Sequence, residues 1–165
     1  MNTFIKTLVA LIAFTIPIAF ASQSKAALGW TWDECQQHWG EPLSSKELSN
    51  GLFTATFEAQ NLVIWVWLKD DQVVRVAYKD QNHDFNGSQI DTLQKANAVS
   101  PTATWVFTYK DESTQNYTWE LREDPDKTDF LAVAIFSVKD NCLIVFTAAD
   151  NQRAKDASTQ NASGL

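Results

Sequence analysis

Cysteine, histidine, glycine and basic residues are all scarce in this chain of 165 residues. It has two cysteines, two histidines and five glycines. Neither histidine lies in a cluster with the ligand spacing of a zinc site, no glycine-rich phosphate loop is present, and no motif indicates a cofactor. Lys and Arg total 13 against 20 Asp and Glu, so the formal net charge is −7. An acidic chain without a basic run is a poor candidate for binding nucleic acid or an anionic membrane surface.

Long hydrophobic runs are also rare, and the one that exists is at the N-terminus. Lys6 precedes an apolar stretch from Leu8 to Phe20, and Ala19-Phe20-Ala21 has the small-x-small pattern of a cleavage site. The stretch is shorter than the ~20 residues that cross a bilayer. We therefore expect residues 1–21 to be a signal peptide and the mature protein to be periplasmic or secreted, without a membrane span. The alternative is an uncleaved membrane anchor.

The part of the chain that follows the predicted signal peptide is long enough to form one domain with a hydrophobic core. The chain contains seven tryptophans, and such a composition argues against overall disorder. We predict a single domain over residues 22–148. Residues 149–165 are polar and small, so we expect them to form a flexible tail.

A complete helix signal stands directly at the start of this domain. Thr31 and Glu34 form a capping box, Gly40 suits the position after the helix, and Pro42 prevents its continuation. The spacing predicts a helix over 31–39 with three side chains on its buried face, namely Trp32, Cys35 and Trp39.

The rest of the chain indicates two units of the same plan, at about 28–80 and 86–148. A second helix is expected from Ser88, as its cap, to about Ala98. The aromatic and β-branched runs predict strands at 51–59, 61–69 and 72–79, then at 103–110, 116–123, 130–138 and 142–148. Short links between strands favour meanders. The predicted fold class is α+β: two tandem helix–β-meander units forming an antiparallel sheet with helices on one face.

The first helix resembles a motif of a known family. It matches the pattern G-x-[ST]-x-x-[QE]-V-x-x-x-[LFWY]-G-x-P of the SmpA/OmlA family of small outer-membrane assembly lipoproteins at Gly29, Thr31, Glu34, Trp39, Gly40 and Pro42. The tandem helix–meander plan resembles the β-lactamase-inhibitory-protein family. Cys35 replaces the usual aliphatic residue, and the lipid-attachment cysteine is absent. The resemblance implies a binding protein whose contact surface is an open sheet face.

Strand alternation indicates which side chains this face carries. Leu62, Ile64, Val66 and Leu68 are the expected core row of their strand, so the alternate residues face away from the helices. Seven candidates for a binding surface result: Thr54, Thr56, Trp65, Trp67, Arg75, Glu120 and Arg122. Trp and Arg commonly anchor interfaces. We predict a non-catalytic module that binds another protein of the envelope or medium. The alternative that a loop or the tail covers the two tryptophans stays open.

A different class of function, a secreted enzyme or a calcium-dependent protein, has two weaker indications. Six oxygen-bearing residues have the spacing of a calcium loop: Asp80, Asn82, Asp84, Asn86, Ser88 and Asp91. However, Phe85 occupies the position that requires glycine, and a polar linker is the simpler interpretation. Cys35 and His38 are three residues apart and have the residue types of a thiolate dyad, whereas a buried structural thiol is the simpler interpretation.

The two cysteines, Cys35 and Cys142, allow one disulfide if the chain enters an oxidising compartment. Two separate buried thiols that pack as small apolar side chains are the alternative.

Overall fold

The computed structural model describes the backbone of residues 27–163 and the side chains of residues 27–158. The predicted signal peptide, residues 1–21, lies outside this part of the chain. Within the described residues, no helix has the length and apolar content needed to cross a membrane.

The described residues form three helices and eight strands. The helices are α1 (Trp32–Trp39), α2 (Gly87–Ala96) and α3 (Ala148–Ser163). The strands are β1 (Ser44–Glu47), β2 (Phe53–Ala59), β3 (Leu62–Lys69), β4 (Gln72–Asp80), β5 (Thr104–Asp111), β6 (Asn116–Arg122), β7 (Ala132–Ser137) and β8 (Cys142–Thr147).

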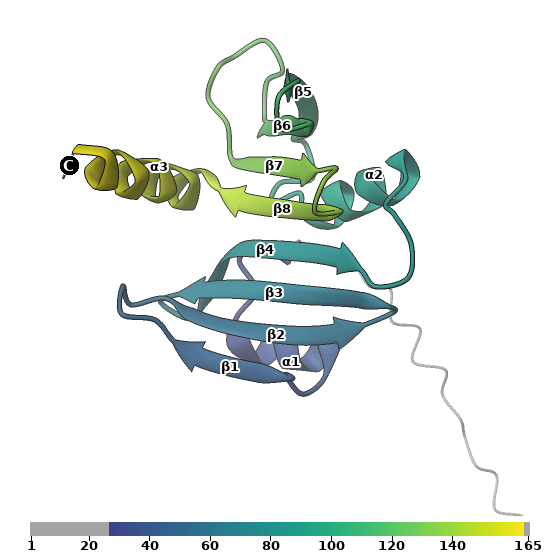
Figure 1. The fold of residues 1–165 in the computed structure, drawn as a ribbon, viewed down its shortest axis with the longest axis vertical. Coiled ribbons are helices and arrows are strands. Elements are labelled where there is room, and N and C mark those ends of the chain that lie inside the picture. Colours follow the sequence, from purple (N-terminus) through teal and green to yellow (C-terminus); the bar gives the residue numbers. More distant parts are fainter. Residues whose placement is uncertain (1–26, 164–165) are drawn as a thin grey trace, which may run out of the picture.

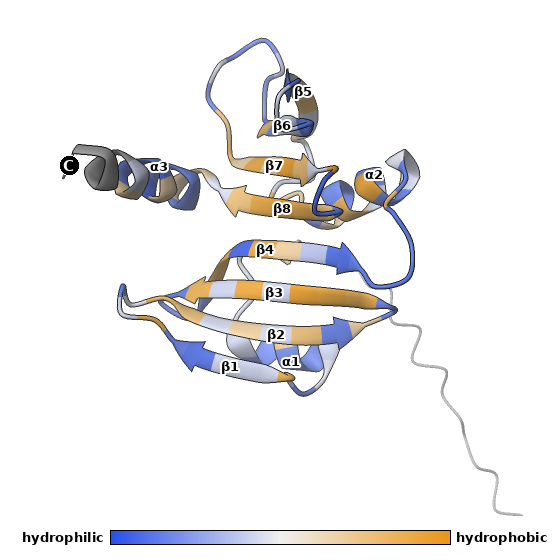
Figure 2. Cartoon of the chain, viewed as in Figure 1, coloured by the Kyte–Doolittle hydropathy of each residue, from blue (hydrophilic) through white to orange (hydrophobic). Residues whose placement is uncertain are grey.

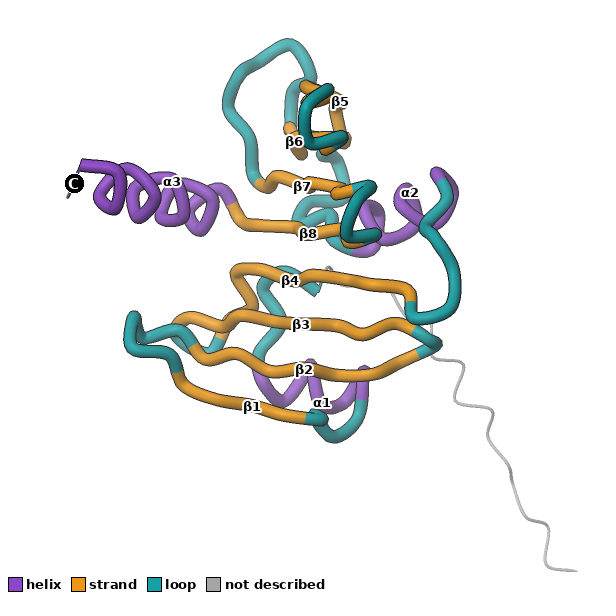
Figure 3. The backbone as a smooth tube through the Cα atoms, viewed as in Figure 1, coloured by secondary structure: helices purple, strands orange, loops and turns teal. Residues whose placement is uncertain are grey.

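All eight strands belong to one antiparallel sheet with the order β1-β2-β3-β4-β8-β7-β6-β5 (Figure 1). In chain order, α1 precedes the meander β1–β4 and α2 precedes the meander β5–β8. The last strands of the two meanders, β4 and β8, pair with each other. The tube in Figure 3 shows both meanders and the junction between them. The predicted α+β class with an antiparallel sheet is confirmed.

Strand β1 is an addition to the predicted elements, because no strand was predicted between the first helix and residue 51. All four of its residues are exposed. It is a strand because it pairs with β2, for example through Ser44 and Thr56, at an edge of the sheet where no side chain needs burial.

The core lies between the sheet and helices α1 and α2. Its fully buried side chains include Phe57, Ile64, Val66, Val76, Leu143 and Val145. The hydropathy colouring shows apolar segments along the central strands (Figure 2). Trp32 and Trp39 of α1 lie with their ring centroids 5.0 Å from Phe53 and 5.4 Å from Phe57. These contacts place α1 on β2.

Both helices that cover the core begin with a reciprocal cap. In α1, the Thr31 hydroxyl accepts from the Glu34 amide and the Glu34 carboxylate accepts from the Thr31 amide. In α2, the residues that exchange these bonds are Asn86 and Gln89. The prediction of Ser88 as the second cap was therefore wrong, because the capping box starts two residues earlier.

Helix α3 replaces most of the predicted flexible tail, so that prediction was wrong for residues 149–163. It starts immediately after β8 and runs outward from the sheet (Figure 1). The Thr147 hydroxyl accepts from the Asp150 amide at 3.2 Å, and Asp150 is buried. Its sequence has no apolar face from which a helix would be predicted, and long-range contacts described below stabilise its first turn.

Candidate functional site

The sheet face opposite α1 and α2, called the open face below, carries two rows of cross-strand neighbours. The strand register places the first row in the order Thr54, Trp67, Arg75, Phe146, Val133 and Glu120. The second row runs Thr56, Trp65, Ala77, Ile144, Ile135 and Thr118. Arg122 follows Glu120 by two positions and so shares this face. All seven candidates for a binding surface therefore lie on one face, as strand alternation predicted.

Four of the seven candidates gather around one groove. Thr54, Thr56, Trp65 and Trp67 line a hollow of about 440 Å³ whose outer wall is formed by β1, including Lys46. Both tryptophans are partly exposed. The Thr54 hydroxyl donates to the carbonyl of Val66 at 2.9 Å, which fixes one side of the hollow. We call this hollow the open-face groove.

Arg75 lies beside this groove but is engaged within the chain. Its Nε donates to Asp150 Oδ2 at 2.8 Å, and the guanidinium carbon lies 5.1 Å from the Trp67 ring centroid and 4.9 Å from that of Phe146. The other Asp150 oxygen accepts from Arg153 at 3.0 Å. Arg75 thus holds the first turn of α3 against the open face. Helix α3, which was not among the predicted helices, therefore starts on the face opposite α1 and α2.

Glu120 and Arg122 form a separate group. Arg122 Nε donates to Glu120 Oε2 at 3.1 Å, and its Nη1 donates to the carbonyl of Pro125, also at 3.1 Å. Four strand spacings separate β6 from β3, which is roughly 19 Å. The structure therefore does not bring this pair together with Trp65 and Trp67.

Among the six residues with calcium-loop spacing, Asp80, Asn82 and Asn86 take part in local hydrogen bonds. Asp80 Oδ1 accepts from the amides of Asn82 at 2.8 Å and His83 at 3.0 Å, and these bonds hold the pKa of Asp80 below its usual value. Asn86 caps α2, and Asp91 lies on α2. Within the described residues, no group of three or more His, Cys, Asp or Glu side chains has the geometry of a metal site.

The described cysteines are both free thiols. Cys35 is fully buried under α1, and this burial raises its pKa to about 12, so it is a protonated thiol at neutral pH. Its proposed dyad partner His38 stacks on Trp30 with 4.2 Å between ring centroids. The geometry therefore offers no activated nucleophile at this pair.

The position of Cys142 explains why no disulfide is formed. It pairs in register with Lys79 of β4, two residues beyond Ala77 of the open face. Cys35 packs in the core on the other side of the sheet. A bond between the two sulfur atoms would have to pass through the sheet, so the interpretation as two separate thiols fits the structure.

A second hollow lies on the other side of the sheet, and it was not predicted from the sequence. It has a volume of about 1170 Å³ and lies between the segment before α1, helix α2 and the strands β5 and β6. Trp30, Gln94, Trp105 and Trp119 are among its lining residues. We call it the helix-side cleft. Aromatic residues alternate at 105, 107, 117 and 119, and this pattern was the sequence signal for an aromatic surface on two strands. Whether a helix covers these strands depends on the strand order, which the pattern does not contain.

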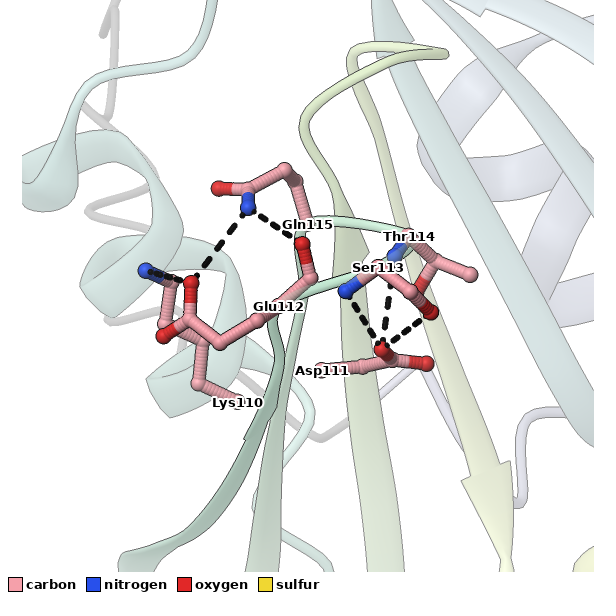
Figure 4. Close-up of polar contacts among 6 residues, drawn as sticks. All are labelled: Lys110, Asp111, Glu112, Ser113, Thr114 and Gln115. Carbon is pink, nitrogen blue, oxygen red and sulfur yellow. Dashed lines mark hydrogen bonds and ion pairs between the residues drawn. The ribbon is translucent and has the colours of Figure 1, made fainter.

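The turn between β5 and β6 holds these aromatic residues in register. Asp111 Oδ1 accepts from the amides of Ser113 and Thr114 and from the Ser113 hydroxyl (Figure 4). These bonds lower the pKa of Asp111 to about 2. Lys110 Nζ lies 2.9 Å from Glu112 Oε2 and 5.7 Å from the Tyr117 ring centroid. The hairpin is therefore ordered up to its tip.

Comparisons with known proteins show a distant structural likeness only. No protein-family model matches the chain, and no curated protein matches it. Among solved structures, a cysteine-rich secretory protein from Staphylococcus aureus is similar at 12% identity with a TM-score of 0.42, covering 74% of this chain and 45% of that one. An extracellular protein containing an SCP domain, from Bacillus anthracis, is similar at 11% identity with a TM-score of 0.42, covering 76% and 47%. The chain thus spans about half the length of these proteins.

Proposed function

We propose that the chain is a secreted or periplasmic, non-catalytic binding module that recognises another protein through the open-face groove. The observation that carries this proposal is the pairing of Trp65 and Trp67 on β3, partly exposed in a hollow beside the sheet edge. Localisation follows from the signal peptide predicted at residues 1–21. The tandem helix–meander plan, with its resemblance to the SmpA/OmlA and β-lactamase-inhibitory-protein families, supports a sheet surface as the contact.

The make-up of the groove favours a protein partner. Two tryptophans form its floor, and large aromatic side chains dominate the binding free energy of many protein interfaces. Ser44, Ser45 and Lys46 form a polar rim on β1, and a polar rim around an apolar centre is the usual anatomy of such a contact. Thr54 and Thr56 complete the wall. Arg75 contributes indirectly, because its guanidinium packs on Trp67 and orients that ring.

The proposal is tested by site-specific photo-crosslinking in the periplasm or medium of the source cells. A photoreactive residue at Thr56, in the groove, is expected to trap a discrete protein partner. The same residue at Thr118, in the same cross-strand row but on β6, is the matched control and should not. Capture at both positions alike, or at neither, would refute the groove as the contact.

A double variant then tests the two tryptophans. Trp65→Ala with Trp67→Ala is expected to keep a native circular dichroism spectrum and to weaken binding of the trapped partner at least tenfold, or by more than about 1.4 kcal/mol. Trp119→Ala, a tryptophan on the opposite face, is the control and should bind normally. Loss of folding in the double variant would show that the two side chains serve the core instead.

A further inference from the structure

The two edge strands of the sheet differ in how they are protected. β1 and β5 stand at the two ends of the strand order, so the outer backbone edge of each pairs with no strand of the described residues (Figure 1). A free edge pairs with other strands unless charges, proline or short length prevent it. β1 has only four residues, all exposed, and Lys46 and Glu47 are two of them. β1 is therefore a protected edge.

Strand β5 lacks this protection over most of its length. It has eight residues, and residues 104–109, Thr-Trp-Val-Phe-Thr-Tyr, include neither a charged residue nor a proline. All six are of types that favour strands. The ladder to β6 has a bulge between Phe107 and Tyr109, which disturbs the edge there and leaves residues 104–107 regular. The outer edge of this regular segment can accept a further strand.

Apolar surface lies on both faces of the sheet beside this edge. Phe107 is 53% exposed and Tyr109 is 60% exposed. On the helix side, the ring centroid of Phe107 lies 5.9 Å from that of Trp119 and 6.4 Å from that of Tyr117. Tyr109 pairs in register with Thr118 and so lies on the open face. Exposed apolar surface that gathers in one place commonly marks an interaction site.

The sequence of β5 is complementary to a second copy of itself in the antiparallel direction. Both charged residues of the strand, Lys110 and Asp111, stand at its C-terminal end. An antiparallel pair centred on Val106 places the charged ends of the two copies far apart, whereas a parallel pair would place like charges side by side. The antiparallel pair also sets Trp105 of each copy opposite Phe107 of the other, and such aromatic cross-strand pairs are stabilising.

Charge on the rest of the chain restricts where two copies can meet. The chain has a formal charge of −7, so two copies repel each other over most of their surfaces. Residues 104–109 are uncharged. Glu120, the neighbour of Val106 on β6, is paired with Arg122, whose Nε donates to it at 3.1 Å. The β5 edge is therefore a surface at which two acidic copies can approach.

The area at this edge is that of a weak dimer. An aromatic side chain has about 200 Å² of surface. The exposed parts of Phe107 and Tyr109 from two copies therefore supply roughly 400 Å². The paired backbone and the other β5 side chains would have to supply the rest of the about 1,000 Å² that a specific interface needs. This balance favours a reversible dimer over an obligate one.

We propose that two copies of the chain associate through β5, which pairs with β5 of the second copy in the antiparallel direction about a two-fold axis at Val106. The contact joins the two sheets into one and covers Phe107. A two-fold contact uses the same edge of both copies, so only the protected β1 edges remain outside and the association stops at two copies. The open-face groove lies at the β1 end of the sheet, so the dimer carries two free grooves.

The first test is sedimentation velocity of the mature chain from about 1 μM to about 1 mM, the range of a weak interface. We expect conversion from one copy to two as the concentration rises, and no larger species. A single copy throughout this range, or growth beyond two copies, would overturn the proposal.

A charged variant tests the edge itself. Val106→Lys should weaken dimerisation at least tenfold, because the two introduced ammonium groups meet at the axis. Ser45→Lys, on the β1 edge, is the matched control and should dimerise as the natural chain does. Circular dichroism checks that both variants fold. If Val106→Lys dimerises normally, the copies do not meet at β5 and the proposal is wrong.

A more conservative variant tests the register. Residues that face each other in an antiparallel pair have Cα atoms roughly 4.5–5.5 Å apart, which a disulfide can span. Val106→Cys should therefore form a covalent dimer in air that reductant separates. Ser45→Cys and the natural chain, which has the half-buried Cys142, should stay unlinked. No linkage of Val106→Cys, or equal linkage of all three chains, would contradict pairing about this residue.

Discussion

Asp150, at the start of α3, accepts a hydrogen bond from Arg75, in the middle of β4, at 2.8 Å. The carboxylate is 1% exposed and the guanidinium side chain 23%. This pair joins two segments that are remote in the sequence, and Arg153 adds a second bond to the same carboxylate. It accounts for the position of a helix that has no apolar face of its own.

Loss of this carboxylate should therefore release α3 from the sheet. Asp150→Asn is expected to lower the free energy of unfolding by roughly 2 kcal/mol, less than for a fully buried ion pair because both arginines are partly solvated. Urea unfolding measures the change, and amide hydrogen exchange should show lost protection in α3. Asp156→Asn, on the exposed part of the same helix, is the matched control, and an equal effect there would contradict the role of Asp150.

The start of α2 gives a second prediction. Asn86→Ala should lower stability by about 1 kcal/mol, because the Gln89 amide loses its acceptor. Ser88→Ala should change stability by less than about 0.5 kcal/mol, since its side chain does not cap the helix. Thermal unfolding of both variants measures the difference. The reverse order of effects would show that Ser88 caps α2.

The thiols should differ in reactivity. Burial raises the pKa of both, to about 12 for Cys35, but Cys142 is half-buried while Cys35 has no exposed surface. Iodoacetamide at pH 8 should modify Cys142 slowly and leave Cys35 intact in the native chain. Both should react in denaturant without reductant, as mass spectrometry can show. A chain that takes up no label in denaturant until it is reduced would contain the disulfide after all.

Stability should fall at alkaline pH. The pKa of Cys35 is raised from 9.0 to about 12 by burial, so the thiol ionises in the unfolded chain first. The stabilisation is complete below pH 9 and is lost as the pH rises toward 12, at about 1.4 kcal/mol for each pH unit. Burial also raises the pKa of Tyr78, which adds to the loss above pH 10. Urea unfolding from pH 8 to 11 measures the slope.

A Cys35→Val variant is the control for this alkaline effect. It removes the thiol but keeps an apolar side chain at the position, so its stability should fall less steeply between pH 9 and 10. If the free energy of unfolding of this variant fell with pH as steeply as that of the natural chain, Cys35 would not be the source of the alkaline loss of stability.

The elements that could be predicted are those with a local cause. The capping box of Thr31 and Glu34 defines the start of α1, and the period-two alternation around Trp65 assigns the faces of β3. The same alternation placed all seven candidate residues on one face. These patterns depend on neighbours within a few positions of the chain, so one sequence is sufficient to recognise them.

The elements that could not be predicted have distant causes. Residues 44–47 form a strand because β2 lies beside them, and α3 depends on Arg75 in another strand. The division of the candidate residues into an open-face groove and the remote Glu120–Arg122 pair follows from the strand order, which no local pattern contains. The helix-side cleft was missed for the same reason.

The pairing of β4 with β8 also has a consequence for the nascent chain during its synthesis. The first meander, β1–β4, consists of hairpins with short turns, which close early because their contacts are local. Strand β4 is synthesised well before β8, and until β8 arrives its outer edge has unpaired amides and carbonyls. Such an edge invites pairing with other chains. Arg75 and Lys79 place positive charges along this strand, so the nascent first half carries its own protection against aggregation during synthesis.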